Sequence, residues 1–369
     1  MFLLGGDFLI KVNLHITNRC NLKCPHCFLE SSRLDMRELE LDVYKSFFKQ
    51  LSRFNTSPIH LTGGEALIRK DCFDIIKLAK QNNLKIELQS NGLCLDNTII
   101  SKLKSLDVKK VYISIDGLEK EHDFRRGKGS YKKAIEAIKN CIEKGISVSV
   151  NICVSHENKD VIFETIKKCA SLKVHDISLL RYNLNIRSNS NGAQVQALSA
   201  KEWIDFIKLI SEKIHEEYRE RSVITAAKSY YKIDREEIQT RAISNNILIF
   251  MTSSGEVYPC GPIVGKIDPI GIFPKDTVEE IINRLAQWEC PKREICKNCA
   301  QVERCGGGCI IEPEDSNDFC SNQSGLYNNS EWYPGCPCIQ KNLMKDLAKG
   351  RWPHNINCSD DFMFYYKTK

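Results

Sequence analysis

The first half of the chain alternates short apolar, β-branched runs with longer stretches whose apolar residues recur every three or four positions. The short runs have the length of buried strands, and the longer stretches have the periodicity of amphipathic helices. This alternation predicts a parallel sheet with right-handed crossovers, and therefore an α/β fold. The expected strands are 12–17, 58–62, 84–90, 110–116, 146–154 and 175–182, and the expected helices are 38–51, 71–81, 97–106, 131–144 and 160–171.

The second half of the chain is patterned less regularly. Residues 183–200 are polar and predict a loop, while 201–221 predict one more helix with Trp203 on its apolar side. Residues 222–245 are weakly patterned and predict a connector. An apolar run, a Ser-Gly turn and a second run predict a hairpin over 247–260. The rest consists of short segments among cysteines, so bound metal would have to supply much of its stability.

Composition is ordinary for a globular protein of 369 residues, with 42% hydrophobic and 27% charged residues. The net charge of +6 comes from dispersed lysines, and we expect no nucleic-acid partner. No apolar run approaches the roughly 20 residues that span a bilayer. The first residues lack a charged region followed by a long apolar run. We therefore expect neither a membrane span nor a signal peptide.

The cysteine content, 18 residues, is the unusual feature of the composition. A secreted disulfide scaffold is normally shorter and spreads its cysteines as pairs. Here an enzyme-sized chain clusters them at ligand spacings, which favours metal sites in a reducing cytoplasm. Cys72, Cys141 and Cys169 are exceptions, because they lie on helical patterns and are expected to be packed thiols.

Three cysteines follow the first predicted strand in the spacing C-x3-C-x2-C. Cys20, Cys24 and Cys27 can hold three corners of an iron–sulfur cube, which leaves one iron without a protein ligand. An open coordination position is typical of a catalytic metal site. A zinc knuckle or three reduced thiols are the alternatives. Zinc sites usually use two C-x2-4-C pairs, and His26 is badly placed as a fourth ligand, so the spacing favours iron and sulfide.

Polar or glycine-rich segments stand at the ends of the next three predicted strands. In alternating α/β folds, functional residues gather at the carboxyl ends of the strands. Taken alone, each segment is an ordinary turn. Together with the cysteine loop they predict one site. The segments are Gly63-Gly64-Glu65 after 58–62, Ser90-Asn91 at the end of 84–90, and Ser114 with Asp116 at the end of 110–116.

This combination resembles the radical SAM superfamily. The resemblance implies that Cys20, Cys24 and Cys27 hold a [4Fe–4S] cluster whose open iron binds the amino and carboxylate groups of S-adenosylmethionine. One-electron reduction then cleaves the cofactor to a 5′-deoxyadenosyl radical. A non-catalytic iron–sulfur or zinc protein is the alternative. It would explain the cysteines but not the polar groups at three successive strand ends.

The same resemblance implies contacts to S-adenosylmethionine. Glu65 is expected to accept a hydrogen bond from the methionine ammonium, and Gly63 and Gly64 to let the ligand approach the backbone. Residues 122–127, HDFRRG, are similar to an HDxxRG segment whose arginine, here Arg126, reaches the carboxylate; a solvated basic loop is the alternative. The other implied contacts are Ser90, Asn91, Ser114 and Asp116 to methionine carboxylate or ribose, and Asn151 near adenine.

A second cysteine set occupies the C-terminal region in the spacing C-x2-C-x5-C-x3-C. A zinc ribbon would favour two C-x2-C pairs, and this run has only one. The run resembles the core of the SPASM domain, which carries auxiliary iron–sulfur clusters. The resemblance implies an outer cluster on Cys296, Cys299, Cys305 and Cys338, with Cys336 and then Cys320 as substitutes for the last ligand, and an inner cluster on Cys260 and Cys309.

The sequence departs from the SPASM pattern at the inner cluster. Asp276 stands five residues after Gly271, where that pattern has a cysteine. A carboxylate is an unusual ligand for iron in such a cluster. Cys290, Cys320 or Cys336 could replace it, so one or two auxiliary clusters are expected.

The resemblance therefore implies a partial (β/α)6 TIM-like barrel over 1–221, a connector over 222–245 and a SPASM-type domain over 246–369. The implied activity is hydrogen abstraction, most plausibly in modifying a ribosomally made peptide or protein by cross-linking, epimerisation or oxidation. A small molecule or a tetrapyrrole is the alternative substrate. Flavodoxin or ferredoxin would donate the electron. Only 19 residues precede Cys20, so a separate carrier protein could replace the peptide-binding domain of some relatives.

Overall fold

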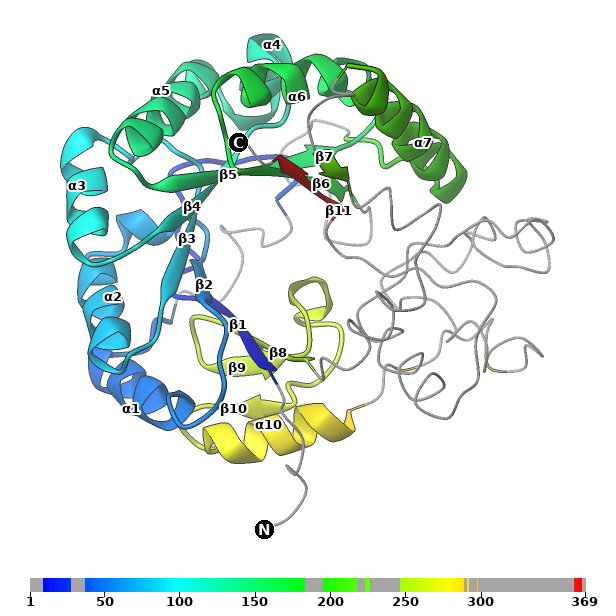
Figure 1. Cartoon of the computed structure of the whole chain (residues 1–369). Coiled ribbons are helices and arrows are strands. Elements are labelled where there is room, and N and C mark those ends of the chain that lie inside the picture. The colour runs from blue at the N-terminus through cyan, green and yellow to red at the C-terminus, as the bar shows by residue number, and fades with distance from the viewer. Residues whose placement is uncertain are drawn as a thin grey trace.

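The computed structural model shows one curved sheet whose outer face is covered by helices (Figure 1). The sheet order is β10-β9-β8-β1-β2-β3-β4-β5-β6-β11-β7, and the two end strands do not pair with each other. The expected α/β partial barrel is confirmed. The structure describes residues 9–27, 37–182, 195–217, 223–225, 246–288, 291, 297 and 362–366.

Strands β1 to β6 lie side by side in chain order and run parallel. This is the arrangement that alternating strands and helices predict. Each strand falls within about three residues of its expected bounds. The strands are β1 (Leu9–His15), β2 (Ile59–Thr62), β3 (Ile86–Ser90), β4 (Lys110–Ser114), β5 (Ser147–Val154) and β6 (Asp176–Arg181).

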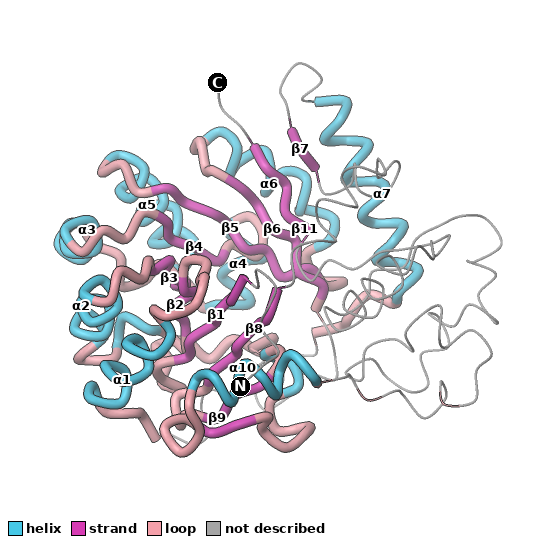
Figure 2. Tube along the Cα trace, turned by 60° about the horizontal axis from the view of Figure 1, so that its bottom comes forward, coloured by secondary structure: helices cyan, strands magenta, loops and turns pink. Residues whose placement is uncertain are grey.

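Strands from distant parts of the sequence extend the sheet at both sides. Figure 2 shows β8 beside β1 and β11 beside β6. Strands β8 and β9 are antiparallel, so the predicted hairpin is confirmed. These outer strands are β7 (Val223–Thr225), β8 (Asn246–Met251), β9 (Glu256–Tyr258), β10 (Gly271–Ile272) and β11 (Phe362–Tyr366).

Most helices occupy the expected segments, and α3 and α10 begin at residues whose side chains cap them. The Asp96 side chain accepts from the Ile99 N–H at the start of α3, and Thr277 forms a capping box with Glu280 at the start of α10. The α-helices are α1 (Leu41–Leu51), α2 (Cys72–Gln81), α3 (Asn97–Ser105), α4 (Glu119–Arg126), α5 (Ser130–Glu143), α6 (Ile162–Ser171), α7 (Ala200–Glu217) and α10 (Val278–Gln287), with 3-10 turns η1 (Ala66–Ile68), η2 (Lys159–Val161) and η3 (Gly261–Ile263).

The hydrophobic core lies between the sheet and the helices. Alternate strand residues such as Val12, Leu61, Leu88 and Val111 are buried in it. Because successive side chains of a strand point to opposite faces, the residues between them face the concave side of the sheet. Cys72, Cys141 and Cys169 are buried in the same core as free thiols, as expected.

The concave face of the sheet is polar at its N-terminal end. His60 Nε2 lies 3.0 Å from Glu87 Oε2, and the Tyr112 hydroxyl donates to the same oxygen over 2.9 Å. Lys110 Nζ lies 2.8 Å from Asp176 Oδ2. Burial raises the pKa of Glu87, but the bonds from His60 and Tyr112 outweigh it, so the net pKa is lowered. Closed barrels usually fill this layer with branched apolar side chains.

We expect His15 to make the fold sensitive to acid. Burial against Phe250, with ring centroids 4.5 Å apart, lowers the pKa of His15 to about 3. An unfolded histidine titrates near 6.5, so below that pH the unfolded chain binds a proton that the folded chain excludes. The contribution of neutral His15 to the free energy of unfolding is therefore lost as pH falls from 6.5 towards 3. Between pH 7.5 and 5 the loss is about 2 kcal/mol.

Urea unfolding of the parent and of His15→Gln at these two pH values measures this effect. The variant should lose about 2 kcal/mol less than the parent over the interval, since its side chain does not titrate. An equal loss in both proteins would show that other groups carry the acid sensitivity.

Candidate cofactor and cluster site

The cluster loop, residues 18–27, continues from β1 at the carboxyl edge of the sheet. Cys20, Cys24 and Cys27 are free, half-buried thiols on this loop. They lie close enough that Cys27 raises the pKa of both other thiols. Burial, opposed by Arg126, raises the pKa of Cys24 to about 11. Burial therefore disfavours the thiolate forms of Cys20 and Cys24, and the iron of a bound cluster would offset this.

The thiol spacing suits a cluster better than a single ion. In the part of the chain that the structure describes, no three His, Cys, Asp or Glu side chains converge tightly enough to hold one metal ion. A [4Fe–4S] cluster binds each cysteine through a different iron, so its ligands lie farther apart than those of a single ion. That these three cysteines hold a cluster with one open corner stays a prediction.

Gly63 and Gly64 let the β2 end pack directly on the cluster loop. The Gly64 N–H donates to the Thr17 carbonyl over 2.8 Å, and the Glu65 N–H donates to the Arg19 carbonyl over 2.9 Å. A Cβ on Gly63 would lie 2.5 Å from the Thr17 oxygen, and one on Gly64 2.3 Å from the Arg19 oxygen. Neither position has room for a side chain, so these glycines are required by the cluster loop itself.

The Glu65 carboxylate joins the ends of β2 and β3. It is 1% exposed and accepts from the Asn91 N–H over 2.8 Å, from the Leu67 N–H over 3.3 Å and from the Ser90 hydroxyl. Burial raises the pKa of Glu65 in spite of these bonds. The Asn91 side-chain amide then donates to Asn21 Oδ1 on the cluster loop over 2.7 Å. Glu65, Ser90 and Asn91 are therefore brought together as expected, although the bond from Glu65 to an ammonium group stays a prediction.

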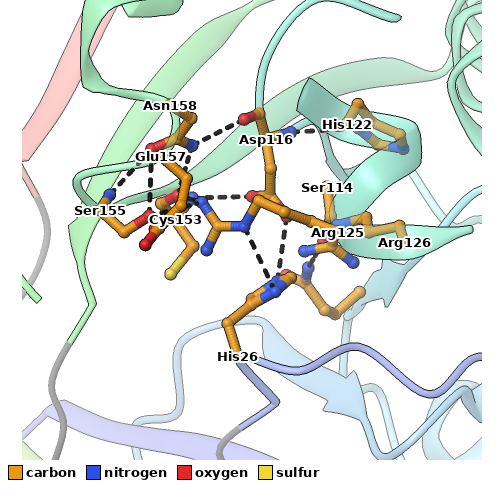
Figure 3. A network of polar contacts seen from close by, with 11 residues as sticks. His26, Ser114, Asp116, His122, Arg125, Arg126, Cys153, Ser155, Glu157 and Asn158 are labelled. Carbon is orange, nitrogen blue, oxygen red and sulfur yellow. Dashed lines mark hydrogen bonds and ion pairs between the residues drawn. The ribbon is translucent and has the colours of Figure 1, made fainter. Parts of the chain in front are cut away.

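Asp116, just beyond β4, is the centre of a second network (Figure 3). Its Oδ2 lies 3.0 Å from His26 Nε2 and 2.5 Å from Arg126 Nε, and its Oδ1 accepts from the Cys153 N–H over 2.9 Å. The residue is fully buried. Burial raises the pKa of this carboxyl, but Arg126 and His26 hold it well below its usual range. The predicted contact of Asp116 to a ligand remains untested, whereas its protein partners are defined.

Two arginines of α4 turn towards this site. The charge of Arg126 lowers the pKa of Cys20, Cys24 and Glu65, which places it beside the cluster loop and the β2 end. Arg125 is buried and donates to the Cys153 carbonyl over 2.8 Å and to the Ser155 hydroxyl over 3.2 Å. The site therefore carries a positive charge where the carboxylate of a bound cofactor could be received.

A row of hydrogen-bonding side chains lies on the concave face just below the strand ends. Asn151 Nδ2 donates to Gln89 Oε1 over 2.9 Å, and Gln89 Nε2 lies 3.5 Å from Ser114 Oγ. Ser114 and Asn151 were expected at the site. Gln89 was not, although its place between Leu88 and Ser90 marks an inward position on the strand. His26 and Arg125 were also missed as site residues.

Most of the second cysteine set lies outside the described residues. Cys260 follows β9 and is half-buried. The expected cluster ligands Cys296, Cys299, Cys305, Cys309 and Cys338, and their substitutes Cys290, Cys320 and Cys336, fall in the part that the structure does not describe.

Asp276 closes the turn between β10 and α10. Its Oδ2 accepts from the Ile272 N–H over 2.7 Å, and its Oδ1 lies 3.0 Å from Arg284 Nη2. Because both oxygens have protein partners, we expect Asp276→Ala to lower the unfolding temperature and to leave the iron content at the parent value. Iron analysis after anaerobic reconstitution checks this, and a loss of about four iron atoms per chain would instead make Asp276 a cluster ligand.

This fold and site are similar to those of radical SAM proteins. Residues 14–169 match the family model of the Radical SAM superfamily. Proteins of this superfamily use a [4Fe–4S] cluster together with S-adenosylmethionine. The matched segment contains the cluster loop, the Glu65 bonds and the Asp116 network.

The relatives fall into two groups by name, one for heme or coproporphyrin synthesis and one for maturases. The chain is 29% identical to Fe-coproporphyrin III synthase of Methanosarcina barkeri over 57% of this chain and 54% of that protein. It is 30% identical to the mycofactocin maturase MftC of Mycolicibacterium smegmatis over 52% of this chain and 48% of that protein. The chain thus spans about half the length of these relatives. An AdoMet-dependent heme synthase of Methanosarcina barkeri is 26% identical, over 81% of this chain and 93% of that protein.

Solved structures share the fold. Streptococcus suis SuiB bound to S-adenosylmethionine superposes with a TM-score of 0.62 at 15% identity, covering 83% of this chain and 73% of SuiB. The AdoMet complex of anSMEcpe gives a TM-score of 0.63 at 18% identity, covering 92% of this chain and 97% of that one. At these identities the likeness shows the fold alone.

Among the described helices, none is both long and apolar enough to cross a membrane.

Proposed function

We propose that this chain is a radical SAM enzyme whose cluster is held by Cys20, Cys24 and Cys27. When bound, a reduced [4Fe–4S] cluster with S-adenosylmethionine supplies a 5′-deoxyadenosyl radical that abstracts hydrogen from an unactivated carbon. The observation that carries the proposal is the convergence of strand ends on the cluster loop. Glu65 and Asn91 reach it from β2 and β3, and Asp116 reaches it from β4.

Each group would bind or orient one part of S-adenosylmethionine. The Gly63-Gly64-Glu65 segment would receive the methionine ammonium, and Arg126 would receive the carboxylate as a charge-assisted pair. Ser90, Asn91, Ser114 and Asp116 would line the methionine carboxylate and ribose, and Asn151 would lie near adenine.

For the substrate, we favour a peptide. Two relatives are named as maturation proteins, mycofactocin maturase MftC and the sporulation killing factor maturation protein SkfB of Bacillus subtilis. SuiB has been solved with its precursor peptide SuiA. The modification would be a cross-link, an epimerisation or an oxidation.

A tetrapyrrole is the second candidate substrate. Three relatives are named for heme, pre-heme d1 or coproporphyrin synthesis. A flat apolar macrocycle needs apolar or aromatic walls.

The C-terminal cysteines would complete the enzyme as a SPASM-type domain over 246–369. Cys296, Cys299, Cys305 and Cys338 would hold one auxiliary cluster, and Cys260 with Cys309 would belong to another. Flavodoxin or ferredoxin would deliver the electron, and a carrier protein could present the peptide. The described cysteines form no disulfide with one another, which suits a reducing cytoplasm.

Anaerobic reconstitution tests the enzyme proposal. We expect labile sulfide, and 5′-deoxyadenosine when dithionite and S-adenosylmethionine are added. Zinc without labile sulfide would refute the proposal.

For the substrate, the enzyme would be co-expressed with a short peptide encoded beside it, and separately supplied with iron-coproporphyrin III. A mass change in the peptide supports peptide maturation, whereas turnover of the porphyrin alone replaces it with the tetrapyrrole alternative.

A further inference from the structure

We infer that His26 is a positioning residue that ties the cluster loop to the end of β4 through Asp116. This inference rests on the proposed function, because it assumes that Cys24 and Cys27 hold the cluster. His26 stands between these two cysteines, one residue from Cys27 and two from Cys24. A shift of its backbone must therefore move both proposed ligands.

The His26 ring is held on both of its nitrogens. Its Nε2 lies 3.0 Å from Asp116 Oδ2, and its Nδ1 accepts from Arg125 Nε over 3.4 Å. A carboxylate only accepts and a guanidinium only donates, so these partners select the tautomer with the proton on Nε2. The ring is buried, and its two bonds point to different elements, β4 and α4.

Asp116 is a rigid anchor for this ring. Its Oδ1 accepts from the Cys153 N–H, its own N–H donates to His122 Nδ1 over 3.1 Å, and its carbonyl accepts from Asn158 Nδ2 over 2.6 Å. These contacts come from β5, α4 and the loop before η2. A buried carboxylate held in so many directions has little freedom to follow the cluster loop, so the loop is fixed by it.

The same oxygen of Asp116 also holds Arg126. His26 Nε2 and Arg126 Nε both contact Oδ2, over 3.0 and 2.5 Å (Figure 3). One atom therefore sets the distance between the cluster loop and the guanidinium that would bind the methionine carboxylate. Loss of the His26 contact should loosen this distance while Cys20, Cys24 and Cys27 stay available to iron. S-adenosylmethionine must reach the open iron and Arg126 together, so its affinity reports that distance.

Three substitutions of His26 separate its two bonds. Leu fills the space and makes neither bond. Gln places an amide nitrogen as many bonds from Cβ as His Nε2, so it can donate to Asp116. Asn places an oxygen where Nδ1 stands, so it can accept from Arg125 but cannot reach Asp116. The matched control is His60→Leu, because His60 makes the same 3.0 Å histidine–carboxylate contact, to Glu87, at the other end of the strands.

The reconstituted proteins are compared by iron and sulfide content, the dissociation constant for S-adenosylmethionine, and the EPR spectrum and midpoint potential of the reduced cluster. We expect His26→Leu and His26→Asn to keep the iron content and to bind S-adenosylmethionine about tenfold more weakly. Adding S-adenosylmethionine should also change the EPR spectrum of their reduced cluster differently from that of the parent. His26→Gln should bind within about twofold of the parent. His60→Leu should lower the unfolding temperature without changing this affinity.

Parent-like affinity and EPR in His26→Asn, or equal weakening in His26→Gln and His26→Asn, would overturn the inference. This pair decides the question even if His26→Leu does not fold. Failure of the proposed function gives a different result. A parent protein without labile sulfide would refute the cluster and the inference together, whereas a clustered parent with insensitive His26 variants would refute the inference alone.

Discussion

Replacing Cys20, Cys24 and Cys27 together by alanine is expected to abolish cleavage of S-adenosylmethionine. The three thiols are the described cysteines on the cluster loop, and the ends of β2, β3 and β4 contact that loop. Without thiolates the iron of a [4Fe–4S] cluster has no protein ligand at this edge of the sheet. Anaerobically reconstituted variant should contain about four fewer iron atoms per chain than the parent, and 5′-deoxyadenosine should fall to background.

Cys94 provides the matched control. It is also a half-buried free thiol, and its sulfur accepts from Asn21 Nδ2 on the cluster loop over 3.5 Å. Its position outside the C-x3-C-x2-C spacing excludes it from the proposed ligand set. Cys94→Ala should therefore keep the iron content and the formation of 5′-deoxyadenosine. Undiminished product from the triple variant, or loss of the cluster in Cys94→Ala, would contradict the ligand assignment.

The proposed auxiliary clusters would make the triple variant informative beyond activity. The proposed ligands in the C-terminal cysteine set are untouched by it. Absorbance of those clusters should therefore survive, which separates loss of one site from failure of the whole chain to fold. Complete loss of iron would show that the cluster loop is needed for the entire protein.

The fold was largely predictable because its strands are short, apolar and separated by amphipathic helices. Helices α4 and α10 and strands β7, β10 and β11 were not expected, and helix α4 is the clearest case. Its sequence, EKEHDFRR, has no apolar stripe, and the segment was considered only as a binding motif or a basic loop. Polar contacts hold it instead, since His122 accepts from the Asp116 N–H and Arg125 reaches the Cys153 carbonyl. Periodicity does not report bonds of this kind.

The sequence predicted many of the residues that lie at the site but not which hydrogen bonds and ion pairs they form there. Parallel strands bring their carboxyl ends to one edge, so Glu65, Asn91 and Asp116 could be grouped from the sequence alone. Their partners could not, because bonds such as Glu65 to Asn91 and Asp116 to His26 join different loops. Gln89 was missed for a related reason. Its importance comes from facing Asn151 two strands away, which only the sheet register reveals.

Removal of the Glu65 carboxylate is expected to have the second largest effect. Glu65→Ala would leave the Asn91 and Leu67 N–H groups and the Ser90 hydroxyl without their acceptor in a buried place. Each unsatisfied buried donor costs about 1–3 kcal/mol. The loops at the ends of β2 and β3 should therefore shift, and affinity for S-adenosylmethionine should fall by at least about a hundredfold.

Glu65→Gln should have a smaller effect of the same kind. It keeps the shape of the side chain but replaces one accepting oxygen with a donor, so one of the two N–H groups loses its partner. We expect about tenfold weaker binding of S-adenosylmethionine, with the iron content of the parent. Equilibrium dialysis with the reconstituted protein measures both variants.

Glu87→Gln is the control that separates local from general destabilisation. Glu87 lies on β3, as Ser90 does, and its carboxylate is likewise bound by two partners, His60 and Tyr112. It faces the N-terminal half of the concave surface, three residues before Ser90 and therefore about 10 Å further from the strand end. Its substitution should lower the unfolding temperature and leave the affinity for S-adenosylmethionine unchanged. Equal losses of affinity in Glu65→Gln and Glu87→Gln would attribute the effect to general destabilisation, and parent-like affinity in Glu65→Ala would remove Glu65 from the binding site.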